Sequence, residues 1–120
     1  MKFCWCTIRV RNMEESLNFY REAVGLSLNK RYTSQSGKDI SFLGDGETKL
    51  ELISDPNFRA FSECESISFG FEVESIEEKI KLIKEKGLEV HKGPIQPNEK
   101  IKYFYVKDPD GINIQFVENK

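Results

Sequence analysis

The chain has 120 residues, enough for one domain that buries roughly two-thirds of its unfolded surface. Charged residues make up 32% and hydrophobic residues 38%, and the net charge of −2 predicts no overall electrostatic attraction to nucleic acids or anionic membranes. No apolar run approaches the roughly 20 residues that a membrane-spanning helix needs.

The first ten residues are too few and too polar for a signal peptide, which predicts a cytoplasmic protein with reduced cysteines. They alternate as a strand with two faces, Cys4, Cys6, Ile8 and Val10 on one and Phe3, Trp5, Thr7 and Arg9 on the other. We interpret Cys4 and Cys6 as small core residues on the apolar face.

A helix is expected next, with Asn12 as N-cap, Glu15 at the capping-box position and Gly25 just past its end. Strands are predicted after it, and their ranges are 26–33, 40–43 and 49–53. Gly44-Asp-Gly46 predicts a tight hairpin turn between the last two strands.

The same order of elements then recurs. Residues 55–64 interrupt the periodicity and are interpreted as a connector, and residues 66–73 alternate as a strand. Ser75 is the expected N-cap of a second helix that ends at Gly87, followed by a strand around Leu88–His91. The Gly93-Pro94 and Pro97-Asn98 pairs predict a loop.

The end of the chain reads as a hairpin. Asp108-Pro-Asp-Gly111 is strong turn chemistry, preceded by the β-prone run 102–106 and followed by the alternating residues 112–117. An internal repeat of about 63 residues therefore divides one domain, 1–120, into modules 1–54 and 65–120. Each module is strand, helix and three strands, an α+β arrangement, and two such modules are expected to pair because one cannot bury its sheet alone.

With Thr7-Ile-Arg-Val10, Ser16-Leu-Asn-Phe-Tyr20 and Asp108-Pro-Asp-Gly111 in these places, the chain resembles the vicinal-oxygen-chelate superfamily of glyoxalase I, bleomycin-resistance proteins and extradiol dioxygenases. The resemblance implies two paired βαβββ modules whose curved, mostly antiparallel sheets enclose a cavity, with the helices outside. It also implies a homodimer.

Metal-dependent relatives bind a divalent ion through one inward residue from each of four strands, usually His, Glu, His and Glu. The resemblance places these positions at Trp5, Glu51, Ser68 and Gln115. The indole of Trp offers no lone pair, and Ser and Gln are weak neutral ligands, so three of the four positions are substituted. We therefore expect neither a tightly bound metal nor another cofactor, and no metal-dependent glyoxalase I activity.

Each of the remaining candidate site residues has two interpretations. Trp5 is filler or a stacking platform for a flat ligand. Arg9 contacts a ligand carboxylate or pairs with Glu51 or Glu72, and Glu51 is a general base or the partner of Arg9. Ser68 and Gln115 bind the ligand or each other. His91, the single histidine, lies outside the four positions and is interpreted as a surface or edge-strand residue.

Two functional hypotheses follow. In the first, the protein binds a small molecule in a metal-free cavity, in resistance or detoxification, with Trp5, Arg9, Glu51, Ser68 and Gln115 as ligand-binding residues. In the second, it is a glyoxalase- or epimerase-like lyase or isomerase that uses a non-standard metal site or Glu51 as base. Neither nucleic acid nor membrane is an expected partner.

Overall fold

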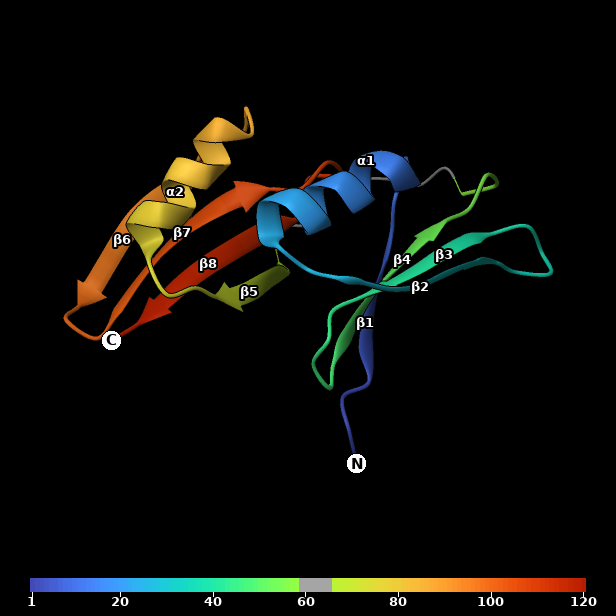
Figure 1. Cartoon of the computed structure of the whole chain (residues 1–120), viewed down its shortest axis with the longest axis horizontal. Helices are drawn as coiled ribbons and strands as arrows, with labels where there is room; N and C mark the ends of the chain where they lie inside the picture. The colour runs from blue at the N-terminus through green and yellow to red at the C-terminus, as the bar shows by residue number, and fades with distance from the viewer. Residues whose placement is uncertain (59–65) are drawn as a thin grey trace. The chain divides into compact units, whose positions relative to one another are not determined.

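The computed structural model describes residues 1–58 and 66–120, and they form two compact units, one on each side of that gap (Figure 1). Most of the predicted connector 55–64, with Cys64 in it, lies outside the described residues. Each unit is a four-stranded mixed sheet with helix on one face, and together they give an α+β structure.

The first unit contains β1 (Trp5–Arg9), α1 (Met13–Asn18), η1 (Phe19–Val24), β2 (Leu28–Thr33), β3 (Asp39–Leu43) and β4 (Lys49–Ser54). Its strand order is β1-β4-β3-β2, in which β1 and β4 run parallel and the other neighbours antiparallel. The second unit contains β5 (Ser68–Glu72), α2 (Ile76–Glu85), β6 (Lys92–Asn98), β7 (Ile101–Lys107) and β8 (Asn113–Asn119). Its order, β5-β8-β7-β6, repeats that of the first unit.

The helix ends follow the predicted caps. The side chain of Asn12 accepts a hydrogen bond from the backbone N–H of Glu15 at 2.9 Å, and Ser75 does the same for Glu78 at 3.2 Å. The first helix widens after Asn18 into the π-helical turn η1, whose end is Gly25 in the left-handed region (φ 98°). The periodicity predicted one continuous helix here, and the structure divides it into α1 and η1.

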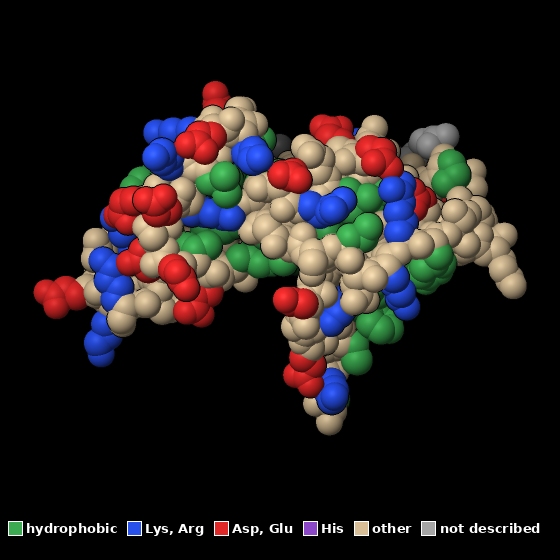
Figure 2. All heavy atoms as spheres, viewed as in Figure 1, with side chains coloured by type: hydrophobic (Ala, Val, Ile, Leu, Met, Phe, Trp, Pro, Cys, Tyr) green, Lys and Arg blue, Asp and Glu red, His purple; other side chains and the backbone are tan. Residues whose placement is uncertain are grey.

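Each helix covers the apolar face of its own sheet. α1 packs against β4, and α2 packs against β7 and β8. In the first unit the side chains buried by this packing include Leu17, Tyr20, Leu43, Leu50 and Leu52. In the second unit they include Ile76, Ile83, Phe104, Val106, Ile114 and Phe116. The outer surface of α2 carries intermingled acidic and basic side chains (Figure 2).

One strand lies later in the chain than predicted. Residues 88–91 form no strand, and β6 instead runs through the two proline-containing pairs that predicted a loop. Proline is tolerated because β6 is an edge strand whose pairing with β7 shifts register between Lys92 and Ile95 and again before Asn98. Gly93 allows β6 to lie close to Phe104 of β7, since a Cβ at this position would lie 3.1 Å from both the Cα and the Cβ of Phe104.

Two smaller expectations also need correction. The β3–β4 hairpin is closed by residues 44–48 rather than by a tight turn at Gly44-Asp-Gly46. Cys4 is exposed because it precedes β1, so it is not a core residue, whereas Cys6 is half-buried and burial raises the pKa of its thiol. No helix in the described ranges is both long and apolar enough to cross a membrane.

The closing turn forms as predicted and aligns the last two strands. The Asp108 carboxylate accepts hydrogen bonds from the backbone N–H groups of Asp110 (2.9 Å) and Ile112 (2.8 Å). Gly111 adopts φ 88°, and its N–H donates to the Asp108 carbonyl at 3.0 Å. This turn sets the β7–β8 register, which places Gln115 opposite Tyr105.

Candidate functional site

The open face of the first sheet carries the candidate residues of the first unit. Trp5, Thr7 and Arg9 pair with Lys49, Glu51 and Ile53 across the parallel β1–β4 ladder. Their neighbours in the strands alternate to the helix-covered face, where they are more deeply buried. The alternation read from the sequence therefore assigned these side chains to the correct face.

Glu51 is bound by a hydroxyl, not by an arginine. The Thr7 Oγ1 donates to Glu51 Oε1 at 2.5 Å, a short distance typical of a hydroxyl bound to an ionised carboxylate. The bond links the exposed Thr7 side chain to the half-buried Glu51 side chain and orients the carboxylate on the open sheet face.

Arg9 pairs with a residue that the sequence did not suggest. Its guanidinium lies 3.5 Å from the Asp55 carboxylate and 4.8 Å from the ring centroid of Phe58. Within this unit Arg9 therefore pairs with Asp55 rather than with Glu51, because Asp55 follows the end of β4 and so lies next to the end of β1. The Arg9 side chain is 40% exposed and the Asp55 side chain 15% exposed, and the pair lies at the margin of the sheet face.

Trp5 is not a core residue of its unit. Its side chain is 54% exposed and packs edge-to-face on Phe42, with 5.6 Å between ring centroids and 79° between the planes. Phe42 is only 7% exposed, and Lys30 Nζ lies 4.9 Å from its centroid. The indole is thus held by an aromatic neighbour while about half of its surface stays exposed.

Gln115 and Ser68 occupy the open face of the second sheet and do not bind each other. The Gln115 Nε2 donates to the Tyr105 hydroxyl at 3.2 Å, across the β7–β8 ladder. Gly70 is its partner on β5, and a Cβ at Gly70 would lie 3.2 Å from Gln115 Oε1. Ser68 is paired with Asn113, two residues along the same ladder.

The donor chemistry of the four positions does not fit a divalent metal. Of Trp5, Glu51, Ser68 and Gln115, only Glu51 supplies an anionic ligand, and an ion held by one carboxylate keeps most of its water. Within residues 1–58 and 66–120, no three His, Cys, Asp or Glu side chains are grouped as a metal site requires. We therefore assign no chemical step to a metal.

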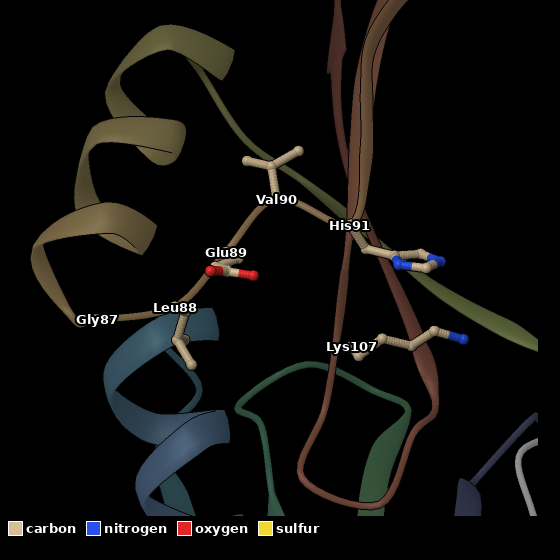
Figure 3. A pocket seen from close by; sticks show the side chains of 6 residues that line it. All are labelled: Gly87, Leu88, Glu89, Val90, His91 and Lys107. Atoms are coloured by element: carbon tan, nitrogen blue, oxygen red, sulfur yellow. The ribbon is translucent and has the colours of Figure 1, made fainter.

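Sequence reasoning missed a group of residues around His91. A pocket of about 230 Å³ is lined by Ser68, His91, Lys92, Tyr105 and Asn113. A neighbouring pocket of about 450 Å³ is lined by 87–91 and Lys107, so His91 belongs to both (Figure 3). The available signal was the alternation of β7, which puts Tyr105 and Lys107 on the same face as Gln115.

The chain is similar in sequence to one protein family and to several individual proteins. The family model described as Glyoxalase/Bleomycin resistance protein/Dioxygenase superfamily matches residues 2–116. A lactoylglutathione lyase of Neisseria meningitidis is 29% identical over 128 residues, covering 100% of this chain and 92% of that protein. The uncharacterized protein YwbC of Bacillus subtilis is 30% identical over 117 residues and covers 92% of both chains.

Solved structures have the same fold. The antibiotic-binding protein TnmS3 from Streptomyces sp. CB03234 superposes with a TM-score of 0.80 at 19% identity, covering 100% of this chain and 97% of that one. Glyoxalase I of Leishmania major gives a TM-score of 0.85 at 21% identity, covering 98% and 86%. The predicted glyoxalase-like fold is therefore confirmed.

Proposed function

Because this chain belongs to the glyoxalase/bleomycin resistance protein/dioxygenase superfamily, we propose that it binds a small molecule on the open faces of its sheets without a tightly bound metal. The ligand-binding residues are Trp5, Arg9, Glu51, Ser68 and Gln115. The protein works as a cytoplasmic homodimer, in resistance or detoxification. No cofactor takes part in this function.

One observation carries the proposal: only one of the four metal-ligand positions holds an anionic donor. The carboxylate at that position, Glu51, is bound by Thr7, and the amide of Gln115 is bound by Tyr105. These hydrogen bonds fix polar groups in place on the sheet faces, which favours recognition of a ligand over capture of an ion. TnmS3, with the same fold, is named as an antibiotic-binding protein, which supports this class of function.

Each residue has a role in this proposal. The exposed face of the Trp5 indole stacks on a flat part of the ligand. Arg9 and Glu51 supply opposite charges near it, and Ser68 and Gln115 supply neutral hydrogen bonds.

A second candidate is a lyase or isomerase in which Glu51 acts as a general base. The observation that favours it is the similarity to lactoylglutathione lyases, which extends over the whole chain. In this candidate Thr7 orients the carboxylate so that its second oxygen accepts a proton from the substrate.

The single tryptophan provides a direct test of the binding proposal. Compounds that copurify with the protein are identified by native mass spectrometry and titrated back while the fluorescence of Trp5 is followed. We expect saturable quenching in the wild type. We expect Trp5→Leu, whose binding is followed by native mass spectrometry, to weaken binding about fivefold, since stacking on an aromatic ring contributes about 1 kcal/mol. Phe3→Leu is the matched control, because Phe3 is also an exposed aromatic residue but precedes β1.

An activity assay separates the two candidates. Formation of S-lactoylglutathione by the purified protein, abolished by Glu51→Gln, would replace the binding proposal with the lyase. Binding to the wild type without turnover would support the binding proposal, and equal binding by the wild type and Trp5→Leu would contradict the role given to Trp5.

A further inference from the structure

The two pockets of the second unit share a wall formed by His91. The backbone N–H of His91 donates to the carbonyl of Tyr105 at 2.7 Å, which fixes the residue beside β7 immediately before β6 begins. The side chains of His91 and Lys107 extend in the same direction from their two neighbouring segments (Figure 3). The imidazole is thus displayed at the sheet surface by a backbone hydrogen bond.

The strand register brings further donors to this surface. Lys92 pairs with Tyr105, and Lys107 pairs with Asn113, which in turn pairs with Ser68. Residues directly opposite each other project from the same face of a sheet. The basic side chains of β6 and β7 therefore share the open face with the hydroxyl and amide groups of Ser68, Tyr105 and Asn113.

These pockets are rich in donors and in positive charge. His91, Lys92 and Lys107 are basic, and among the described residues that line the two pockets Glu89 is the one carboxylate. The Tyr105 oxygen accepts the hydrogen bond from Gln115, so its own O–H is available as a donor to another group. This concentration of basic groups stands out in a chain whose net charge is −2.

We propose that His91, Lys92 and Lys107 form a subsite for the oxyanion of a small ligand, a carboxylate or a phosphate, with the Tyr105 hydroxyl as an additional donor. The inference rests on the proposed ligand-binding function and assigns a charge to its ligand. Lysine ammonium groups and a protonated imidazole bind oxyanions through charge-assisted hydrogen bonds. The pocket volumes of about 230 and 450 Å³ suit part of a small metabolite.

The single histidine makes the test specific, because histidine-selective NMR reports on His91 alone. The full-length protein is titrated with inorganic phosphate and, separately, with succinate, at an ionic strength held constant with sodium chloride. We expect a saturable shift of the imidazole resonances with at least one of the two anions. Phosphate alone or succinate alone would identify the oxyanion, and a shift with either supports the subsite.

Charge variants complete the experiment. Lys107→Gln and Lys92→Gln should each weaken the anion about two- to fivefold, as expected for the loss of a partly exposed ionic contact. Lys84→Gln is the matched control, since Lys84 is an exposed lysine in the last turn of α2 and lines neither pocket. Melting temperatures establish that all three variants fold.

The subsite is overturned if neither anion moves the imidazole resonances, or if Lys84→Gln weakens binding as much as Lys107→Gln. Failure of the general binding proposal has a different signature. A ligand that quenches Trp5, found together with no His91 shift in either anion titration, would refute the oxyanion subsite alone, whereas the absence of any ligand that quenches Trp5 would count against the proposed function.

Discussion

A buried hydroxyl in the first unit has no hydrogen-bond partner. Ser41 is fully buried in β3, and its Oγ is the one buried side-chain polar atom without a partner among the described residues. An unpaired buried hydroxyl costs about 1–3 kcal/mol of desolvation, and alanine removes this group while changing little volume. We expect Ser41→Ala to raise the free energy of unfolding by about 1 kcal/mol in urea denaturation.

Ser16 provides the control for this prediction. It is equally buried but has interaction partners, so Ser16→Ala should lower the free energy of unfolding. A loss of stability in both variants would mean that the Ser41 hydroxyl is satisfied in solution.

Asp108 is the polar residue on which the closing turn depends. It is 5% exposed, and a single carboxylate oxygen accepts two backbone N–H groups. Asp108→Ala leaves both donors without this acceptor, and we expect a loss of about 2–4 kcal/mol in the free energy of unfolding. Asp108→Asn keeps an oxygen acceptor and should lose clearly less. Equal losses in chemical denaturation would show that the negative charge, and not the hydrogen-bond geometry, stabilises the turn.

The contacts at the site were less predictable than its position. Alternation in β1 and β4 was enough to assign Trp5, Arg9 and Glu51 to the open face, because a strand has only two faces. The partners depend on which residues lie level across the sheet and just beyond the strand ends. Thr7 binds Glu51 through the β1–β4 register, and Asp55 reaches Arg9 from the segment after β4. Neither relation follows from the periodicity of one strand.

At the level of helices and strands, most of the predicted boundaries rested on capping and turn residues. Asn12, Gly25 and Ser75 each have a local physical role, so the helix boundaries could be inferred from short stretches of sequence. β6 could not, because its two prolines predict a loop from local chemistry. Its strand pairing is a tertiary feature that depends on β7, and this misplacement also hid His91 from the site.

A substitution at Gly93 tests whether the close contact between β6 and Phe104 of β7 fixes the position of β6. Gly93 has φ 100°, and a Cβ there would lie 3.1 Å from the Tyr103 carbonyl oxygen as well as from Phe104. We expect Gly93→Ala to lower the free energy of unfolding by about 3 kcal/mol, the sum of a left-handed backbone and steric overlap. Thermal and urea denaturation measure the loss.

Gly37 separates the two contributions. It has φ 87°, but a Cβ added there would meet nothing within 4 Å, so Gly37→Ala carries the backbone cost alone, about 1–2 kcal/mol. If the two variants lost equal stability, the contact with Phe104 would not constrain β6.

For the whole molecule, the repeat gives two sheets of the same topology with different chemistry. Glu51 and Gln115 hold equivalent places, each on the strand that pairs in parallel with the first strand of its unit. In the first unit this place carries a carboxylate bound by a hydroxyl, with Trp5 and Arg9 on the same sheet face. In the second it carries an amide bound by Tyr105, near three basic side chains. The two faces thus offer different kinds of contact to a ligand.

The same comparison predicts how the protein responds to metal ions. If the one anionic position binds a divalent ion with a Kd of about 1 mM, about 1 mM of the ion stabilises the fold by about 0.4 kcal/mol, whereas a site with a Kd of about 1 μM would contribute about 4 kcal/mol. At about 4 °C per kcal/mol for a chain of this size, these values correspond to shifts in Tm of about 2 °C and about 15 °C. We expect the smaller shift with about 1 mM Mg²⁺, Mn²⁺ or Ni²⁺ after dialysis against a chelator, and a still smaller shift for Glu51→Gln, which lacks the anionic ligand. A rise of about 15 °C that Glu51→Gln abolishes would establish a tight metal site and favour the lyase, because only a group that binds the folded state tightly can move Tm that far.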